Sequence, residues 1–160
     1  MIRVSGLTKD YGARRAIDRL SFEAEQGEIV GFLGPNGAGK TTTLSVLSCL
    51  LAPTAGQATI AGLDVVAEAT MVKRLIGVVP QEIALYPTLS ARDNLAFFGR
   101  IYGLNGKRLR ARIAEVLDVV GLPERADEAV ENYSGGMRRR LNLAVGLMHR
   151  PQVLFLLSRA

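Results

Sequence analysis

The stretch Gly34-Pro35-Asn36-Gly37-Ala38-Gly39-Lys40-Thr41 decides how the rest of this sequence is interpreted. It fits the pattern G-x-x-x-x-G-K-[ST] at every defined position. The apolar run before it, residues 28–33, predicts a buried strand, and residues 42–51 after it predict a helix with leucines on one face. In the order strand, glycine-rich loop and helix, backbone N–H groups can surround a polyphosphate at the positive end of a helix dipole.

Each residue type in this loop has a role in binding a nucleoside triphosphate. The glycines allow positive φ and a close approach of the backbone to the phosphates. Lys40 can reach the β- and γ-phosphates, and the Thr41 hydroxyl is a candidate ligand for Mg²⁺. An ordinary glycine-rich turn is the alternative, but it does not require the whole pattern in this context. The sequence therefore predicts that a nucleoside triphosphate and Mg²⁺ are bound by Gly34, Pro35, Asn36, Gly37, Ala38, Gly39, Lys40, Thr41 and Thr42.

Composition places the chain among globular proteins. It has 160 residues, of which 48% are hydrophobic and 22% charged, as expected for one domain. It has no run of eighteen apolar residues and no signal-peptide layout at its start, so we expect a soluble, cytoplasmic protein. The single cysteine, Cys49, excludes an internal disulfide and is interpreted as a small buried residue of the helix after the loop.

The net charge of +5 comes mostly from arginine and raises the question of a nucleic-acid partner. Two groups of arginines, in residues 108–112 and 138–140, fall on predicted helices. Glu115 and Asp118 share the first of these predicted helices, and no aromatic residues interleave with either group to stack on bases. We therefore expect solvated or partner-facing helix surfaces and no nucleic-acid partner.

The pattern along the chain is α/β. Strands are predicted at residues 2–8, 20–24, 57–61, 75–79 and 153–157. Between the last two, helices are predicted at 91–102 with Ser90 as N-cap, at 107–120 with Gly121 and Pro123 ending it, and at 136–149. We therefore expect a nucleotide-binding core formed by residues 1–87 and 150–160, with a helical subdomain, residues 88–149, inserted into it.

A second motif, Tyr133-Ser134-Gly135-Gly136-Met137, narrows the choice among phosphate-loop proteins. It resembles the signature of ATP-binding-cassette (ABC) proteins, which usually have leucine at the position of Tyr133. A serine and two glycines opening a helix direct a hydroxyl, N–H groups and the helix dipole at an anion. A serine-capped helix without a ligand is the alternative. The resemblance implies that Ser134, Gly135 and Gly136 contact the γ-phosphate of ATP bound by a second copy, in a head-to-tail dimer.

Two further residues match the family pattern. Gln81, in Val78-Val79-Pro80-Gln81-Glu82, is similar to the family's Q-loop glutamine, which implies contact with Mg²⁺ and the attacking water and coupling to a membrane partner. Tyr11 resembles the aromatic residue that stacks on adenine, because it precedes the phosphate loop by the interval that the family uses. The alternatives are a surface glutamine in a loop and a tyrosine in a turn.

The resemblance covers about residues 1–156 and implies a P-loop NTPase core sheet with an inserted helical signature subdomain. The phosphate loop and residues 85–90 look most like bacterial ATPase subunits of drug, antibiotic or ion exporters. This implies an ATP-binding subunit that powers export through partner transmembrane permease subunits by ATP-driven dimerisation. It would lie on the inner face of the cell membrane, with residues 85–100 toward the permease.

The match stops after Leu156, where the family has Asp-Glu-Pro-Thr and this chain has Leu157-Ser158-Arg159-Ala160. The family's aspartate holds a Mg²⁺-bound water and its glutamate is the general base. Loss of a positioned general base costs about 10²–10⁴ in rate, so hydrolysis by this chain is doubtful while ATP binding can persist. The only histidine, His149, precedes the last strand and does not fill the family's switch role. We expect truncation or loss of reading frame, with the C-terminal part of the core missing.

Three other functions stay open. An ABC-type ATPase that acts on nucleic acid would usually carry long insertions, for which this chain has no room. A non-functional truncated remnant would fold poorly because its last apolar strand meets water. A small phosphate-loop kinase would not need Ser134-Gly135-Gly136-Met137.

Overall fold

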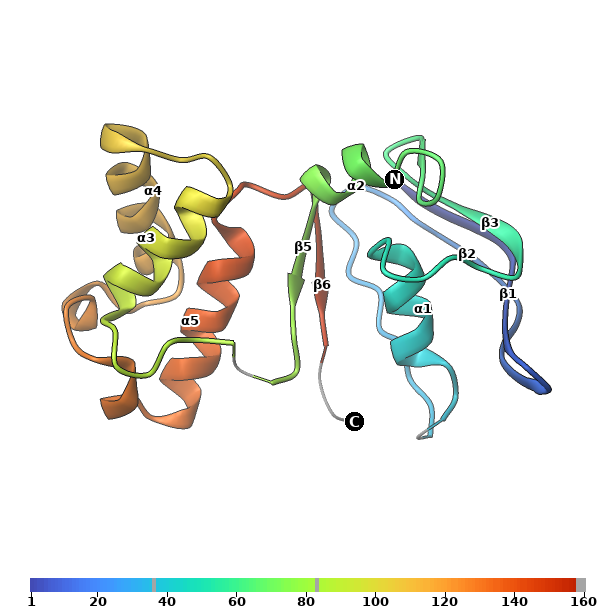
Figure 1. The fold of residues 1–160 in the computed structure, drawn as a ribbon, viewed down its shortest axis with the longest axis horizontal. Coiled ribbons are helices and arrows are strands. Elements are labelled where there is room, and N and C mark those ends of the chain that lie inside the picture. The colour runs from blue at the N-terminus through green and yellow to red at the C-terminus, as the bar shows by residue number, and fades with distance from the viewer. Residues whose placement is uncertain (36, 83, 158–160) are drawn as a thin grey trace. The chain divides into compact units, whose positions relative to one another are not determined.

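The computed structural model describes residues 1–35, 37–82 and 84–157, and the chain divides into two compact units. The N-terminal unit holds Met1–Ile76, and the C-terminal unit begins at Gly77 (Figure 1). The predicted α/β class is confirmed, whereas the predicted division into a core and an inserted subdomain stays a prediction. None of the helices in the described ranges is long and apolar enough to cross a membrane.

The N-terminal unit is built on an antiparallel sheet. Its strands lie in the order β2-β1-β3-β4, and they are β1 (Ile2–Tyr11), β2 (Arg14–Ala24), β3 (Ala55–Ile60) and β4 (Leu63–Asp64). The register pairs Ile2 with Ala24 and Tyr11 with Arg14, so β1 and β2 form a long hairpin. In β3 Ala58 and Ile60 are buried on either side of Thr59, which is the pattern of a sheet with one face covered, and in β1 Val4 and Leu7 are buried on either side of a register shift. The strands predicted at 2–8, 20–24 and 57–61 are therefore confirmed, and the first two are longer than predicted.

The buried strand predicted at residues 28–33 is wrong. The Ile29 side chain is fully exposed and that of Leu33 is 94% exposed. The segment belongs to none of the sheets among the described residues, and of its side chains only the Phe32 ring makes an aromatic contact, edge-on to Phe22 at 5.3 Å. An apolar run becomes a buried strand only when neighbouring strands satisfy its backbone N–H and C=O groups. The apolar composition of residues 28–33 predicted a buried strand, but no strand among the described residues pairs with this segment.

Helix α1 (Lys40–Leu47) follows the phosphate loop and ends earlier than the predicted residue 51. Cys49 adopts a left-handed conformation with φ of 58°, and the N–H groups of Leu50 and Leu51 donate to the Ser45 carbonyl, which closes the helix. Cys49 thus lies just beyond the helix rather than within it. Its partial burial raises the pKa of its thiol, with the charge of Lys73 opposing the shift.

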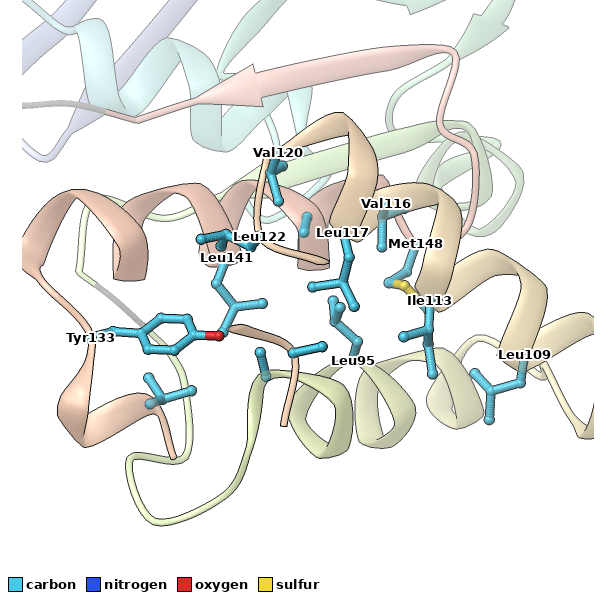
Figure 2. Close-up of a cluster of buried hydrophobic side chains, with 14 residues drawn as sticks. Leu95, Leu109, Ile113, Val116, Leu117, Val120, Leu122, Tyr133, Leu141 and Met148 are labelled. Carbon is cyan, nitrogen blue, oxygen red and sulfur yellow. The ribbon is translucent and has the colours of Figure 1, made fainter. Parts of the chain in front are cut away.

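Three helices build the core of the C-terminal unit: α3 (Ala91–Ile101), α4 (Gly106–Val119) and α5 (Gly135–Leu147). Figure 2 shows side chains from all three meeting in one apolar cluster, with Leu95, Leu117 and Leu141 fully buried in it. Ser90 caps α3 as predicted, because its side chain accepts a hydrogen bond from the Asp93 N–H. Two short 3₁₀ turns, η1 (Pro123–Arg125) and η2 (Val130–Asn132), connect α4 to α5.

Strands β5 (Ile76–Val79) and β6 (Val153–Leu156) pair with each other and run in the same direction (Figure 1). Helix α5 packs closely against β5, since a Cβ on Gly77 would lie 2.4 Å from the Gly146 carbonyl oxygen. Phe155 is buried, while Leu156 is 59% exposed. Helix α2 (Ala69–Leu75) and strand β4 were not predicted, because both are too short to show a periodic pattern.

The close approach of α5 to β5 is tested by Gly77→Ala. The added methyl group must push the helix from the strand, so we expect the free energy of unfolding to fall by about 1–3 kcal/mol, the usual cost of overpacking. Urea denaturation measures this. The matched control is Gly31→Ala, where a Cβ would meet no heavy atom within 4 Å, and we expect a change below about 0.5 kcal/mol. Equal effects of the two substitutions would contradict the packing argument.

Candidate functional site

The phosphate loop is held against strand β2 at a position where only glycine fits. Gly39 is the N-cap of α1 and has φ of 81°. A Cβ there would lie 2.2 Å from the Ala16 carbonyl oxygen, so any side chain would separate loop and strand. The Thr43 hydroxyl donates to the Gly39 carbonyl over 2.9 Å and braces the first turn of the helix. The first turn of α1, with its N-terminal N–H groups, is therefore fixed in position against strand β2.

Lys40 and Thr41 carry the chemistry of this loop. The Lys40 ammonium donates to the carbonyl oxygens of Gly34 and Pro35, the latter over 2.8 Å, so the cation is held by the loop itself. Thr41 is exposed in the first turn of α1, and its hydroxyl has no hydrogen-bond partner among the described residues. Gly34, Pro35, Gly37, Ala38 and Thr42 lie in the same loop and turn, and Asn36 lies outside the described residues. The residues present fit a polyphosphate with Mg²⁺, because a cation, free N–H groups and a free hydroxyl meet here.

Tyr11 lies at the end of β1, opposite Arg14 in the hairpin. Its side chain is 48% exposed, and the Lys9 ammonium lies 5.4 Å from its ring centroid. The hairpin that carries Tyr11 is the same one that contacts the phosphate loop through Ala16. The N-terminal unit therefore combines an accessible aromatic ring with the phosphate loop, and the stacking of Tyr11 on a nucleotide base stays a prediction.

The signature residues open helix α5 in the C-terminal unit. Ser134 is the N-cap, and its side-chain oxygen accepts a hydrogen bond from the Met137 N–H over 3.2 Å. Gly135 and Gly136 form the exposed first turn, where a Cβ would meet no atom closer than 4.0 Å. No acidic residue lies in this first turn to neutralise the positive end of the dipole. The turn is open and positive, which suits an anion.

Tyr133 occupies the position at which the family usually has leucine, and both packing and a hydrogen bond hold it there. Its side chain is 3% exposed, and its hydroxyl donates to the Arg125 carbonyl in η1 over 2.5 Å. Burial raises the pKa of the hydroxyl, Glu128 adds to the rise and Arg125 opposes it. Figure 2 places Tyr133 at the edge of the apolar cluster, near Leu141. The residue before Ser134 is thus fixed by both packing and a hydrogen bond.

Gln81 is exposed and follows Pro80 at the end of β5. The start of its loop is attached to α5, because the Asn142 side-chain amide donates to the Pro80 carbonyl over 3.2 Å. Asn142 is 3% exposed and was not predicted as a site residue. Its signal in the sequence is a polar residue among the apolar ones of a helix. One helix therefore carries the signature serine and also holds the residue before Gln81.

His149 and Arg140 make contacts within the protein that stabilise the ends of helices. His149 stacks on Tyr102, with ring centroids 4.1 Å apart, which fits its interpretation as a residue at a helix end. Arg140 donates to the carbonyls of Val120 and Gly121 and so caps the end of α4. Within the described parts of the chain, no group of three or more His, Cys, Asp or Glu side chains is placed to hold a metal ion.

Comparison with known proteins agrees with this geometry. Residues 17–156 match the family model described as ABC transporter. The linearmycin resistance ATP-binding protein LnrL of Bacillus subtilis is 46% identical over 156 residues, covering 98% of this chain and 50% of that protein. The doxorubicin resistance ATP-binding protein DrrA of Mycobacterium tuberculosis is 48% identical over 155 residues, covering 96% of this chain and 47% of that protein. The chain thus spans about half the length of these relatives.

A solved structure shows the same fold. It is described as a dimeric, post-hydrolysis state of the ATP-binding cassette MJ0796 bound to ADP and Pi. The TM-score is 0.81 at 28% sequence identity, covering 98% of this chain and 73% of that one.

The Tyr133 hydrogen bond is tested by Tyr133→Phe, which keeps the buried ring. We expect the free energy of unfolding to fall by about 1–2 kcal/mol, because the Arg125 carbonyl loses its donor. The matched control is Tyr86→Phe, since the Tyr86 hydroxyl has no hydrogen bond within the described ranges, and it should leave stability unchanged.

The raised pKa of Tyr133 adds a pH test. A hydroxyl whose pKa is higher in the folded chain contributes stability that is present below about pH 10 and is lost as the pH rises further. Urea titrations at neutral and alkaline pH should therefore show a smaller alkaline loss for the phenylalanine variant. The same alkaline loss in both proteins would contradict the assignment.

Proposed function

Because the chain belongs to the ABC transporter family, we propose that it is the ATP-binding part of a drug-resistance type exporter. The observation that carries the proposal is the combination, in one chain, of a phosphate loop closed by Lys40 and a helix capped by Ser134. Named relatives with 46–48% identity are drug-resistance ATP-binding proteins, which supports the exporter type. ATP binding would then be the event that drives two copies together.

Different residues of the site are proposed to contact the phosphates, the adenine and the Mg²⁺ ion of ATP. The loop N–H groups and the Lys40 ammonium bind the polyphosphate, and the Tyr11 ring stacks on the adenine. Thr41 and Gln81 are the proposed protein ligands of Mg²⁺, which neutralises charge on the phosphate oxygens when bound. The free hydroxyl of Thr41 supports its part in this proposal.

A second copy of the chain would complete the site. Ser134, Gly135 and Gly136 are proposed to contact the γ-phosphate of ATP bound by the other copy. The open, positive first turn of α5 supports this contact, and the MJ0796 cassette, solved as a dimer, supports the pairing. Such a contact is isologous, since each copy would offer its own helix to the nucleotide of the other.

The permease would contact the surface around α3. Tyr86, Phe97 and Phe98 form an aromatic group there, with Tyr86 and Phe97 5.0 Å apart and 45% and 39% exposed. Asn94 fixes the segment before α3, because its side chain accepts from the Tyr86 N–H and donates to the carbonyls of Tyr86 and Ser90. Exposed aromatic side chains on a fixed support are typical of protein interfaces. Through this contact the chain would lie at the inner face of the cell membrane.

Hydrolysis is proposed to be weak or absent in this chain. Leu157 follows β6 where the family pattern has the metal-binding aspartate, and its side chain offers no oxygen. The next position, Ser158, where the pattern has the general base, lies outside the described residues. ATP binding depends on Lys40, Thr41 and the loop amides, so it does not require these positions.

ATP binding by the purified chain tests the proposal, with isothermal titration calorimetry as the measurement. Lys40→Ala should weaken MgATP binding at least about tenfold, because it removes a charge-assisted hydrogen bond to phosphate. Lys107→Ala, on the exposed start of α4, is the control and should leave the affinity unchanged. No MgATP binding by the wild type, or equal affinities for all three proteins, would refute the proposed function. Tight, salt-dependent binding to an oligonucleotide would instead favour a nucleic-acid ATPase.

A further inference from the structure

We propose that Arg14, the first residue of β2, is a second cationic ligand of the polyphosphate beside Lys40. This inference rests on the proposed function, because it assigns a further residue to the same ATP site. The pattern G-x-x-x-x-G-K-[ST] contains no position for it, since Arg14 comes from the hairpin before the loop.

The position of Arg14 follows from how β2 lies along the phosphate loop. Its guanidinium nitrogen Nη2 lies 3.5 Å from the point that a Cβ on Gly37 would occupy. Two residues further on, the Ala16 carbonyl lies against Gly39. Residues 14 and 16 of β2 therefore both lie next to the loop, Arg14 through its side chain and Ala16 through its backbone carbonyl. The guanidinium is therefore held directly beside the glycine backbone that would surround the phosphates.

Within the part of the chain that the structure describes, the Arg14 guanidinium is unpaired. It forms no ion pair or hydrogen bond with any residue in the ranges 1–35, 37–82 and 84–157. Its neighbour Arg15 differs, because it bonds Asp10 over 2.9 Å and Asp18 over 3.0 Å. These two carboxylates raise the pKa of the Arg15 guanidinium, with Asp10 contributing most. Adjacent arginines on one strand thus have opposite surroundings, one neutralised and one free.

The unpaired guanidinium of Arg14 lies near two other sources of positive charge, the Lys40 ammonium and the N-terminus of α1. The Lys40 ammonium is held in the loop, and α1 has no acidic residue in its first turn to offset the dipole. A third positive contribution in this place is unfavourable until an anion binds. A polyphosphate removes this repulsion, and a guanidinium can donate two parallel hydrogen bonds to one phosphate group. The hairpin would therefore serve both ends of the nucleotide, with Tyr11 on the base and Arg14 on the phosphates.

The adjacent arginines provide a matched experiment. MgATP, MgADP and AMP are titrated by calorimetry into the wild type, Arg14→Gln and Arg15→Gln. We expect Arg14→Gln to weaken MgATP binding about tenfold, as for loss of a hydrogen bond to a charged group. MgADP should weaken similarly, whereas AMP, with a single phosphate, should change much less. Arg15→Gln should stay within about twofold of the wild type for all three nucleotides, because its charge is already paired.

Three further measurements separate binding from folding. Arg14→Lys keeps the charge but loses the paired donors, so it should recover part of the MgATP affinity that Arg14→Gln loses, which a merely structural role would not predict. The thermal midpoint of Arg14→Gln without nucleotide should not fall below that of the wild type, because no hydrogen bond or ion pair to a described residue is removed and the repulsion from Lys40 is relieved. Raising the salt concentration should weaken MgATP binding more for the wild type than for Arg14→Gln, since screening acts on the removed charge.

The outcomes distinguish this inference from the proposed function. Unchanged MgATP affinity in Arg14→Gln, together with a loss in Lys40→Ala, would overturn the role of Arg14 and leave ATP binding intact. Equal losses in Arg14→Gln and Arg15→Gln would also overturn it, because they would indicate only a general charge effect. A wild type that binds none of the nucleotides would overturn both.

Discussion

The contact between Gly39 and the Ala16 carbonyl is the constraint on which the nucleotide site of the N-terminal unit depends. A Cβ at this point would lie 2.2 Å from that oxygen, so loop and strand can meet only through a glycine. The contact places the first turn of α1 against the β1–β2 hairpin. Lys40 lies at the start of α1, Tyr11 at the end of β1 and Arg14 at the start of β2. The contact between Gly39 and Ala16 fixes α1 to the hairpin and so brings these three elements together. The phosphate loop is therefore positioned by the sheet before it as well as by its own glycines.

Helix α5 has the corresponding role in the C-terminal unit. Its first residues carry the signature, its buried face joins the apolar cluster, and its last turns press against β5 through Gly146. Asn142, one turn before Gly146, bonds the carbonyl that precedes Gln81. Helices transmit position well because their backbone hydrogen bonds resist bending. The signature serine and the start of the Gln81 loop are thus attached to the same rigid element.

Several features of the site follow from short-range chemistry, and for that reason the sequence predicted them. A serine before a helix caps it wherever the helix lies, so Ser90 and Ser134 were recognisable as N-caps. The glycine spacing of residues 34–39 predicted the loop. Strands β1, β2 and β3 and helices α3, α4 and α5 were all predicted, β2 and α4 from the periodicity of their apolar residues, with errors mainly at the ends of the elements.

The sequence by itself thus determined the phosphate loop, the capped signature helix and the α/β class, because each rests on residues close together in the chain. Only the tertiary structure decided the remainder. Residues 28–33 are apolar enough for a buried strand, but a strand needs partners, and Ile29 is fully exposed without them. The partner of Asn142 is the carbonyl of Pro80, 62 residues away, and Arg15 meets Asp10 because the strand register places the two residues opposite each other. Composition and spacing carry no information about such contacts, since they exist only once the chain has folded.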